Sequence, residues 1–139
     1  STAGLCGLVC YAADGPAATA PGQLPAPVAG TGRLMVIFHR PYYERLKKAM
    51  AAEPADARAW RRFGTYGDEA AELANLLAVR KVPEPDRQKW DGLVREAWHA
   101  GVGLQKAIDA KDWTATQAAY RGVIDNCNAC HKAFPPPNF

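Results

Sequence analysis

Apolar side chains recur at three- and four-residue spacing along most of this 139-residue chain, and short turns, the first two of which contain proline, divide the pattern into four stretches. The stretches cover about residues 33–52, 55–81, 85–109 and 112–134. Such spacing places the apolar side chains on one face of an α-helix, and no stretch alternates with the two-residue period of a strand. Four helices joined by short loops predict an all-α fold, an antiparallel four-helix bundle.

The apolar faces of the four expected helices predict the core of the bundle. Large apolar residues dominate these faces, and the last face also carries two cysteines and a histidine. We assign the four tryptophans packing roles only. The expected core residues, from the first helix to the last, are Leu34, Met35, Phe38, Tyr42, Leu46, Ala49, Met50, Trp60, Phe63, Ala70, Leu73, Leu76, Leu77, Trp90, Leu93, Val94, Ala97, Leu104, Ile108, Ala119, Tyr120, Val123, Ile124, Cys127, Cys130, His131 and Phe134.

Proline and glycine mark places where the helices should bend or approach one another. Pro41 has no N–H to donate to the carbonyl of Ile37, so we expect a kink there or a new helix start near Arg40. Gly64 and Gly67 weaken the second helix, but they allow another backbone or a ring to approach it closely.

Two residues favour helix starts. Pro85 suits the first turn of the third helix, because that position leaves a backbone N–H without a helical partner anyway. Asp112 can accept hydrogen bonds from the free N–H groups that follow it, so we expect it to cap the fourth helix.

The N-terminal part of the chain differs in composition from the helical domain at residues 33–139. Residues 1–13 are small and apolar without a charge, too few to span a bilayer at about 20 residues, and they resemble the end of an export or anchor segment. An apolar strand or turn packed on the domain is the alternative. Residues 14–32, rich in proline, alanine and glycine, predict a linker. We expect an exported, periplasmic protein, either free or tethered to the membrane; Cys6 and Cys10 receive no role.

Basic and acidic side chains are interspersed along the chain, 17 of the first kind and 14 of the second, for a formal net charge of +3. No stretch gathers basic residues into a stripe of the kind that follows a phosphate backbone. The charge pattern therefore argues against nucleic acid as a partner.

A short motif near the C-terminus, Cys127-Asn128-Ala129-Cys130-His131, has the C-x-x-C-H pattern of covalent haem attachment. Two thiols three residues apart lie on one side of a helical turn, where each can add to one vinyl group of the same porphyrin. A thioredoxin-like motif belongs at a strand-to-helix junction, and zinc needs two further ligands nearby, so neither suits a motif late in a helix. The sequence predicts one haem c, with His131 as an axial iron ligand.

The pattern Y-x-x-V-x-x-x-C-N-A-C-H-x-x-F, from Tyr120 to Phe134, resembles the haem helix of the class II cytochromes c, the cytochrome c prime family. The resemblance covers about residues 31–135, and outside this helix it rests on helix lengths and patterning. It implies a bundle whose last helix carries the haem, with Phe134 against the porphyrin. The stretch L-M-V-I-F-H-R-P is similar to the first helix of low-spin members and implies Met35 as the second axial ligand.

The second axial ligand has alternatives. Met35 could simply fill the core, which would leave the iron open. His39 lies one turn further along the same face and would give bis-histidine ligation. His99 is expected to be partly exposed, and Met50 lies about four turns beyond Met35, too far to share its iron.

The motifs predict a one-electron carrier for redox partner proteins, and not an enzyme, because no nucleophile–base set or phosphate loop is evident. A five-coordinate haem protein that binds nitric oxide or carbon monoxide is one alternative, and a tethered haem subunit of a larger redox assembly is another. Arg33 and Arg40 are candidate partners of a haem propionate. The resemblance also implies that two copies could associate through their early helices.

Overall fold

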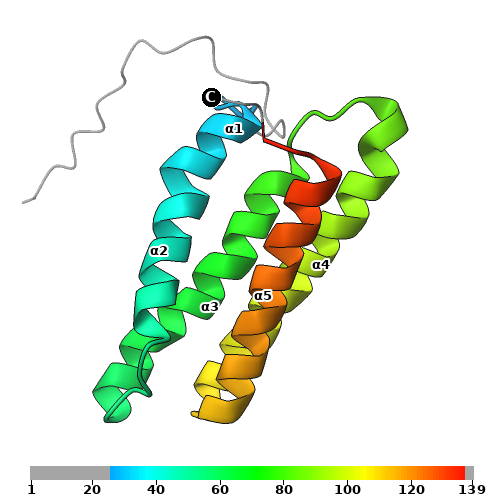
Figure 1. The fold of residues 1–139 in the computed structure, drawn as a ribbon. Helices are drawn as coiled ribbons and strands as arrows, with labels where there is room; N and C mark the ends of the chain where they lie inside the picture. The colour runs from blue at the N-terminus through cyan, green and yellow to red at the C-terminus, as the bar shows by residue number, and fades with distance from the viewer. Residues whose placement is uncertain (1–25, 137–139) are drawn as a thin grey trace, which may run out of the picture.

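The computed structural model describes residues 26–136, and every regular element within that range is helical (Figure 1). The predictions for residues 1–13, including Cys6 and Cys10, and for most of the linker concern residues outside that range. In chain order the elements are α1 (Thr31–Leu34), the π-helical turn η1 (Met35–His39), α2 (Arg40–Ala49), α3 (Ala57–Ala78), α4 (Glu84–Asp109) and α5 (Trp113–Ala133). Since α1, η1 and α2 are continuous, the described residues form four helical segments, which confirms the all-α prediction and is compatible with a four-helix bundle.

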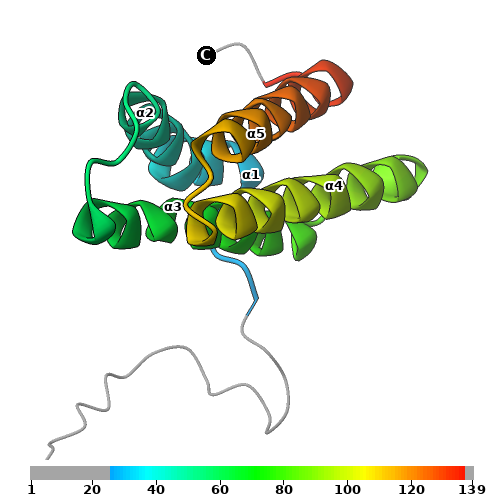
Figure 2. The same ribbon diagram turned by 90° about the horizontal axis from the view of Figure 1, so that it is seen from below.

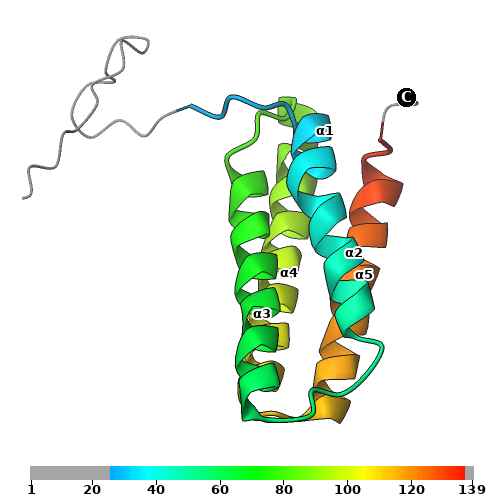
Figure 3. The ribbon, with the colours of Figure 1, turned by 90° about the vertical axis from the view of Figure 1, so that its left-hand side faces the viewer.

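The helical segments form two layers when the molecule is seen end-on (Figure 2). The α3 and α4 helices approach each other closely along their lengths, α5 packs on α4, and α2 packs more loosely on α3. The α2 and α5 helices lie on the same side of the α3–α4 pair, yet they are not among the closely packed pairs. Figure 3 places α1 and the C-terminal end of α5 at the same end of the molecule as the α3–α4 loop.

Side chains of aspartate fix two of the helix starts. Asp112 accepts a hydrogen bond from the N–H of Ala115 at 2.9 Å, so its predicted role as the cap of α5 is confirmed. Asp56 accepts one from Ala59 at 2.7 Å in the same way, and α3 therefore begins after Asp56 instead of at residue 55. Pro85 lies in the first turn of α4, as expected.

The first helix continues through Pro41 because its preceding turn widens. Arg40 donates its backbone N–H to the carbonyl of Met35, five residues earlier, in the π-helical turn η1. This wide turn lies just before Pro41, where the sequence predicts a kink or a new helix start, and the α-helical hydrogen bonding of α2 begins at Arg40, as the second of the two expectations had it. The helical segment as a whole begins at Thr31, two residues before the expected start.

The buried apolar residues form two clusters. The central cluster lies where all four segments meet and contains Tyr42, Leu46, Trp60, Phe63, Ala70, Leu73, Leu104, Ile108 and Val123. The end cluster lies near α1 and contains Leu34, Leu77, Trp90 and Val94, with Met35, Val82 and Phe134 packed against it. Most of the predicted core is therefore confirmed, and the two ends of the helical domain meet in the end cluster.

Two large apolar residues of the predicted core are exposed instead. Leu76 is 37% exposed because the buried face of α3 runs through Leu73 and Leu77, and the 100° step between residues turns Leu76 away from it. Phe38 is 47% exposed because it lies on η1, a turn that no other helix packs against extensively.

Two glycines set the close approach of α3 to α4. A Cβ atom on Gly67 would collide with the backbone of Gln105, so the close approach predicted there is confirmed. A Cβ atom on Gly101 would lie 2.5 Å from the backbone nitrogen of Ala71, a contact that the sequence did not reveal. Gly64, in contrast, has ample space, and its predicted role was wrong.

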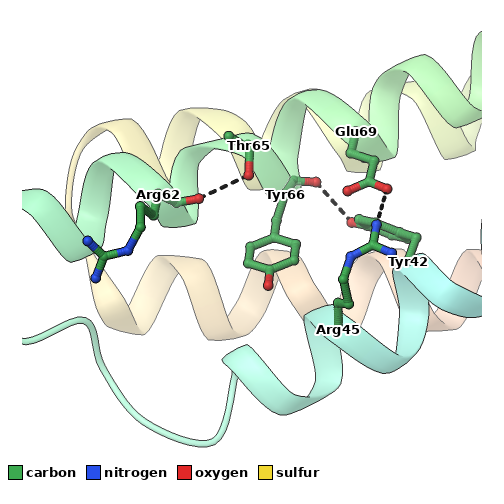
Figure 4. A network of polar contacts seen from close by, with 6 residues as sticks. All are labelled: Tyr42, Arg45, Arg62, Thr65, Tyr66 and Glu69. Atoms are coloured by element: carbon green, nitrogen blue, oxygen red, sulfur yellow. Dashed lines mark hydrogen bonds and ion pairs between the residues drawn. The ribbon is translucent and has the colours of Figure 1, made fainter.

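Polar contacts fasten α2 to α3 (Figure 4). The hydroxyl of Tyr42 donates a hydrogen bond to the carbonyl of Tyr66 at 3.0 Å, and Arg45 forms an ion pair with Glu69. Burial, followed by the nearby charge of Glu69, raises the pKa of the Tyr42 hydroxyl, which therefore stays a donor. These contacts hold α2 against α3 while leaving its other side free to face α5.

The outer faces of the helices carry many charged side chains. Within residues 26–136, no helix combines the length and the apolar character that crossing a membrane would require.

The close crossing of α3 and α4 gives a direct test. Gly101→Ala should lower the free energy of unfolding by about 1–3 kcal/mol, because the added methyl group collides with backbone that cannot move unless the helices separate. Gly103→Ala is the matched control on the same helix: its surroundings are open, so alanine should raise the stability by up to about 1 kcal/mol. Urea unfolding followed by circular dichroism measures both, and equal effects would contradict the crossing.

Candidate functional site

The two thiols and the imidazole of the C-x-x-C-H motif lie on the last turns of α5. Cys127 and Cys130 form no disulfide, and His131 is exposed. Cys127 is exposed as a residue, but nearby protein atoms partly bury its thiol. This burial raises the pKa of the thiol. Burial, then the charges of Cys127 and Glu96, raise the pKa of Cys130. Both sulfurs are therefore neutral thiols near pH 7.

Contacts with α4 and with its own first turn fix the orientation of α5. The side-chain amide of Asn126 donates to the carbonyl of Leu93 at 3.1 Å, directly before the motif. Val123 is buried in the central cluster, and the hydroxyl of the fully buried Thr116 donates to the carbonyl of Asp112 at 2.7 Å. Because α5 cannot rotate freely, the motif keeps a fixed face toward the rest of the domain.

Cys127 lies on the side of α5 that faces the first helix. A negative charge on the Cys127 sulfur would raise the pKa of Tyr42 on α2. The two side chains therefore lie within electrostatic range of each other. Cys130 is instead within range of Glu96 on α4. The motif therefore borders the region between α5, α4 and the first helix.

His39, at the end of η1, is half-buried, and both of its ring nitrogens are shielded from solvent. Neither Nδ1 nor Nε2 has a partner among the described residues. Burial lowers its pKa, and the charges of His131 and Arg80 lower it further. The carbonyls of Leu34 and Leu73 oppose this shift, although neither forms a hydrogen bond of normal geometry with the ring. His39 is therefore neutral near pH 7 and lies within electrostatic range of His131.

Met35 and Phe134 come together in the end cluster, from the first and the last helical segments. The ring of Phe134 meets that of Trp90 edge-on, with centroids 5.2 Å apart. The indole N–H of Trp90 donates to the carbonyl of Leu77 at 3.1 Å and holds the indole in place. The structure thus packs Met35 and Phe134 against the same cluster, at the end of the molecule where the motif lies.

Arg80 is a residue of this region that the sequence analysis missed. It is only 8% exposed, and its side chain donates to the carbonyls of Leu76 at 2.8 Å and Ala29 at 2.5 Å. No carboxylate among the described residues pairs with it. In sequence, Arg80 resembles any cation near a helix C-terminus, and only its burial in the fold distinguishes it.

The remaining candidates lie on the surface or away from the motif. Arg33 and Arg40 are exposed, and their side chains form no hydrogen bond or ion pair within the described range. His99 is exposed beside Trp98, as its prediction had it. Met50 packs against the central cluster, far from the end cluster that holds Met35.

The described part of the chain contains no group of three or more histidine, cysteine, aspartate or glutamate side chains that could hold a metal ion. Comparisons with protein-family models, with curated proteins and with solved structures give no match.

The packing of Phe134 on Trp90 is testable by truncation. Phe134→Ala should lower the free energy of unfolding by about 1–3 kcal/mol, less than the roughly 3–5 kcal/mol typical of a fully buried ring. Phe38→Ala removes the same ring from the exposed face of η1 and should change stability by less than about 0.5 kcal/mol. Urea unfolding followed by tryptophan fluorescence measures both variants. A larger loss for Phe38→Ala would show that the end cluster is misplaced.

Proposed function

We propose that this protein is a monohaem c-type cytochrome that carries single electrons, with the haem attached through Cys127 and Cys130 and with His131 as an axial ligand. The observation that carries the proposal is the C-x-x-C-H motif on α5, with both cysteines free of disulfides and with a half-buried histidine on the first helix whose ring nitrogens have no partner among the described residues. The proposed architecture is an antiparallel four-helix bundle with the haem on its last helix. The apolar residues 1–13 support an exported, periplasmic location.

The side chains around the motif suit a flat, largely apolar group. Cys127 and Cys130 are free cysteines on successive turns of α5, and the S–H of each can add across one vinyl group. Phe134, Met35 and Tyr42 supply apolar surface from α5 and the first helix. The α2 and α5 helices are also the neighbours that do not pack closely together. These residues therefore fit a haem held between the last helix and the first.

The chemistry that a bound haem supplies is the reversible change between ferric and ferrous iron. The imidazole of His131 would hold the iron on one side, and the thioethers of the two cysteines would fix the ring to α5. The surrounding helices would exclude water from the ring and set its potential through burial. The remaining work of the protein is to keep one edge of the ring near the surface for a redox partner protein.

Arg80 is the best candidate to hold a haem propionate. Its guanidinium is buried without a carboxylate, within electrostatic range of His39, and a buried cation is most stable when an anion pairs with it. The sequence-based candidates Arg33 and Arg40 are exposed, where a pairing would contribute less.

Haem attachment is testable by expression in a host that matures c-type cytochromes. The protein should gain the mass of one haem and give the spectrum of a haem with two thioether bonds after treatment with alkaline pyridine. Cys127→Ser or Cys130→Ser should give the spectrum of a single thioether, and the double variant should lose covalent haem. The control is the pair Cys6→Ser and Cys10→Ser, which should retain full attachment. A colourless protein, or haem that depends on Cys6 and Cys10, contradicts the proposal.

The role of Arg80 is testable by potentiometry. Arg80→Gln should lower the reduction potential by on the order of tens of millivolts, because a buried cation near the haem favours the form with less positive charge. Arg33→Gln, the exposed control, should shift the potential less. Arg80→Lys keeps the charge, and its reduction potential should lie between those of Arg80→Gln and the unmodified protein. Equal shifts of the reduction potential in Arg80→Gln and Arg33→Gln would show that Arg80 does not hold a propionate.

A further inference from the structure

His39 has hydrogen-bonding capacity that the protein leaves unused. Both of its ring nitrogens are buried, and neither has a partner among the described residues. A buried polar group without a partner destabilises the folded protein, and such groups are uncommon in folded proteins. A histidine that is kept in spite of this destabilisation is expected to meet a partner when the protein is complete.

The local structure presents His39 from an unusual turn of the helix. The π-helical turn η1 ends at His39, directly before Arg40 and Pro41. The missing N–H of Pro41 removes one hydrogen bond of a regular helix, and the wide turn redirects the side chains that it contains. Such turns inside α-helices are frequent at functional sites.

The position of His39 relates it to the haem-attachment motif. His39 lies on the first helical segment and His131 on the last, and the charge of His131 lowers the pKa of His39. No other histidine of the described chain is placed in this way, because His99 lies on the exposed face of α4. Two imidazoles, one from the first helical segment and one from the last, therefore border the same region.

Met35 has a different environment. It is half-buried and packs against the end cluster of Leu34, Leu77, Trp90 and Val94. A thioether is stable among apolar groups, because its sulfur is a weak hydrogen-bond acceptor and burial costs it little hydration free energy. The packing accounts for Met35, whereas neither nitrogen of His39 has a hydrogen-bond partner of normal geometry among the described residues.

We propose that His39, and not Met35, is the second axial ligand of the haem iron, so that the iron is held by two imidazoles. This inference rests on the proposed haem attachment at Cys127, Cys130 and His131. One nitrogen of His39 would bind the iron, and the other would keep its N–H. The carbonyls of Leu34 and Leu73 lie near enough to accept that N–H after a small adjustment, as the outer partners of ligating histidines commonly do.

The test is the ligand signature of the ferric protein, read by electron paramagnetic resonance and by near-infrared magnetic circular dichroism. The unmodified protein should be low-spin with the signature of two imidazoles and without the weak sulfur-to-iron band near the red end of the visible spectrum. A sulfur-to-iron band in the unmodified protein overturns the proposal. A high-spin ferric spectrum, together with binding of carbon monoxide by the reduced protein, overturns it as well.

Two variants assign the ligand to a residue. His39→Ala should lose the low-spin bis-imidazole signature, and a sulfur band that appears only in this variant, as Met35 takes the vacant position, also supports the proposal. Met35→Leu, the control of similar volume, should keep the bis-imidazole signature. Loss of the low-spin spectrum in Met35→Leu with its retention in His39→Ala overturns the assignment.

The covalent haem content of all three proteins, measured in alkaline pyridine, separates this inference from the proposed function. Full haem content with a sulfur ligand rejects only the role of His39. Absence of covalent haem from the unmodified protein rejects both proposals together.

Discussion

The close crossing of α3 and α4 is the constraint on which the rest of the fold depends. Gly67 and Gly101 let the two backbones approach to a distance that no side chain would permit. The α2 segment is then fastened to α3 through Tyr42, and α5 to α4 through Asn126. Because each outer helix is held by a different member of the central pair, α2 and α5 face each other without packing as closely as α3 and α4. A tightly joined pair thus positions two looser helices, and the candidate site lies between them.

The buried polar groups near the motif differ from those elsewhere in the domain. Two buried hydroxyls elsewhere in the domain are satisfied within the protein: those of Tyr42 and Thr116 both donate to carbonyls. Near the end of the molecule that holds the motif, His39 has no partner and Arg80 has only backbone carbonyls. Buried groups of this kind favour a ligand that offers a metal ion to the lone pair of an imidazole nitrogen and an anion to a guanidinium. A haem, with its iron and propionates, would offer both.

Much of the fold could be predicted from the sequence because its signals are local. Apolar spacing gave the four helical segments, and Asp112 marked the start of α5 through the chemistry of its own side chain. The errors arose where the neighbour of a residue decides its role. Gly64, Gly67 and Gly101 look alike in sequence, but only the last two oppose another backbone. Arg80 and Arg33 are both cations near helix ends, yet only Arg80 is buried. The motif at Cys127 was visible without the fold, whereas the unpartnered state of His39 was not.

The central claim is that the last helix carries a covalent haem, and one peptide tests it most directly. Trypsin should cleave after Arg121 and after Lys132 and release the segment 122–132, which contains both cysteines and His131. Mass spectrometry of this peptide, from protein matured in a competent host, should give the peptide mass plus one haem, together with strong visible absorption. Recovery of the same peptide with two free thiols and no added mass would contradict the account.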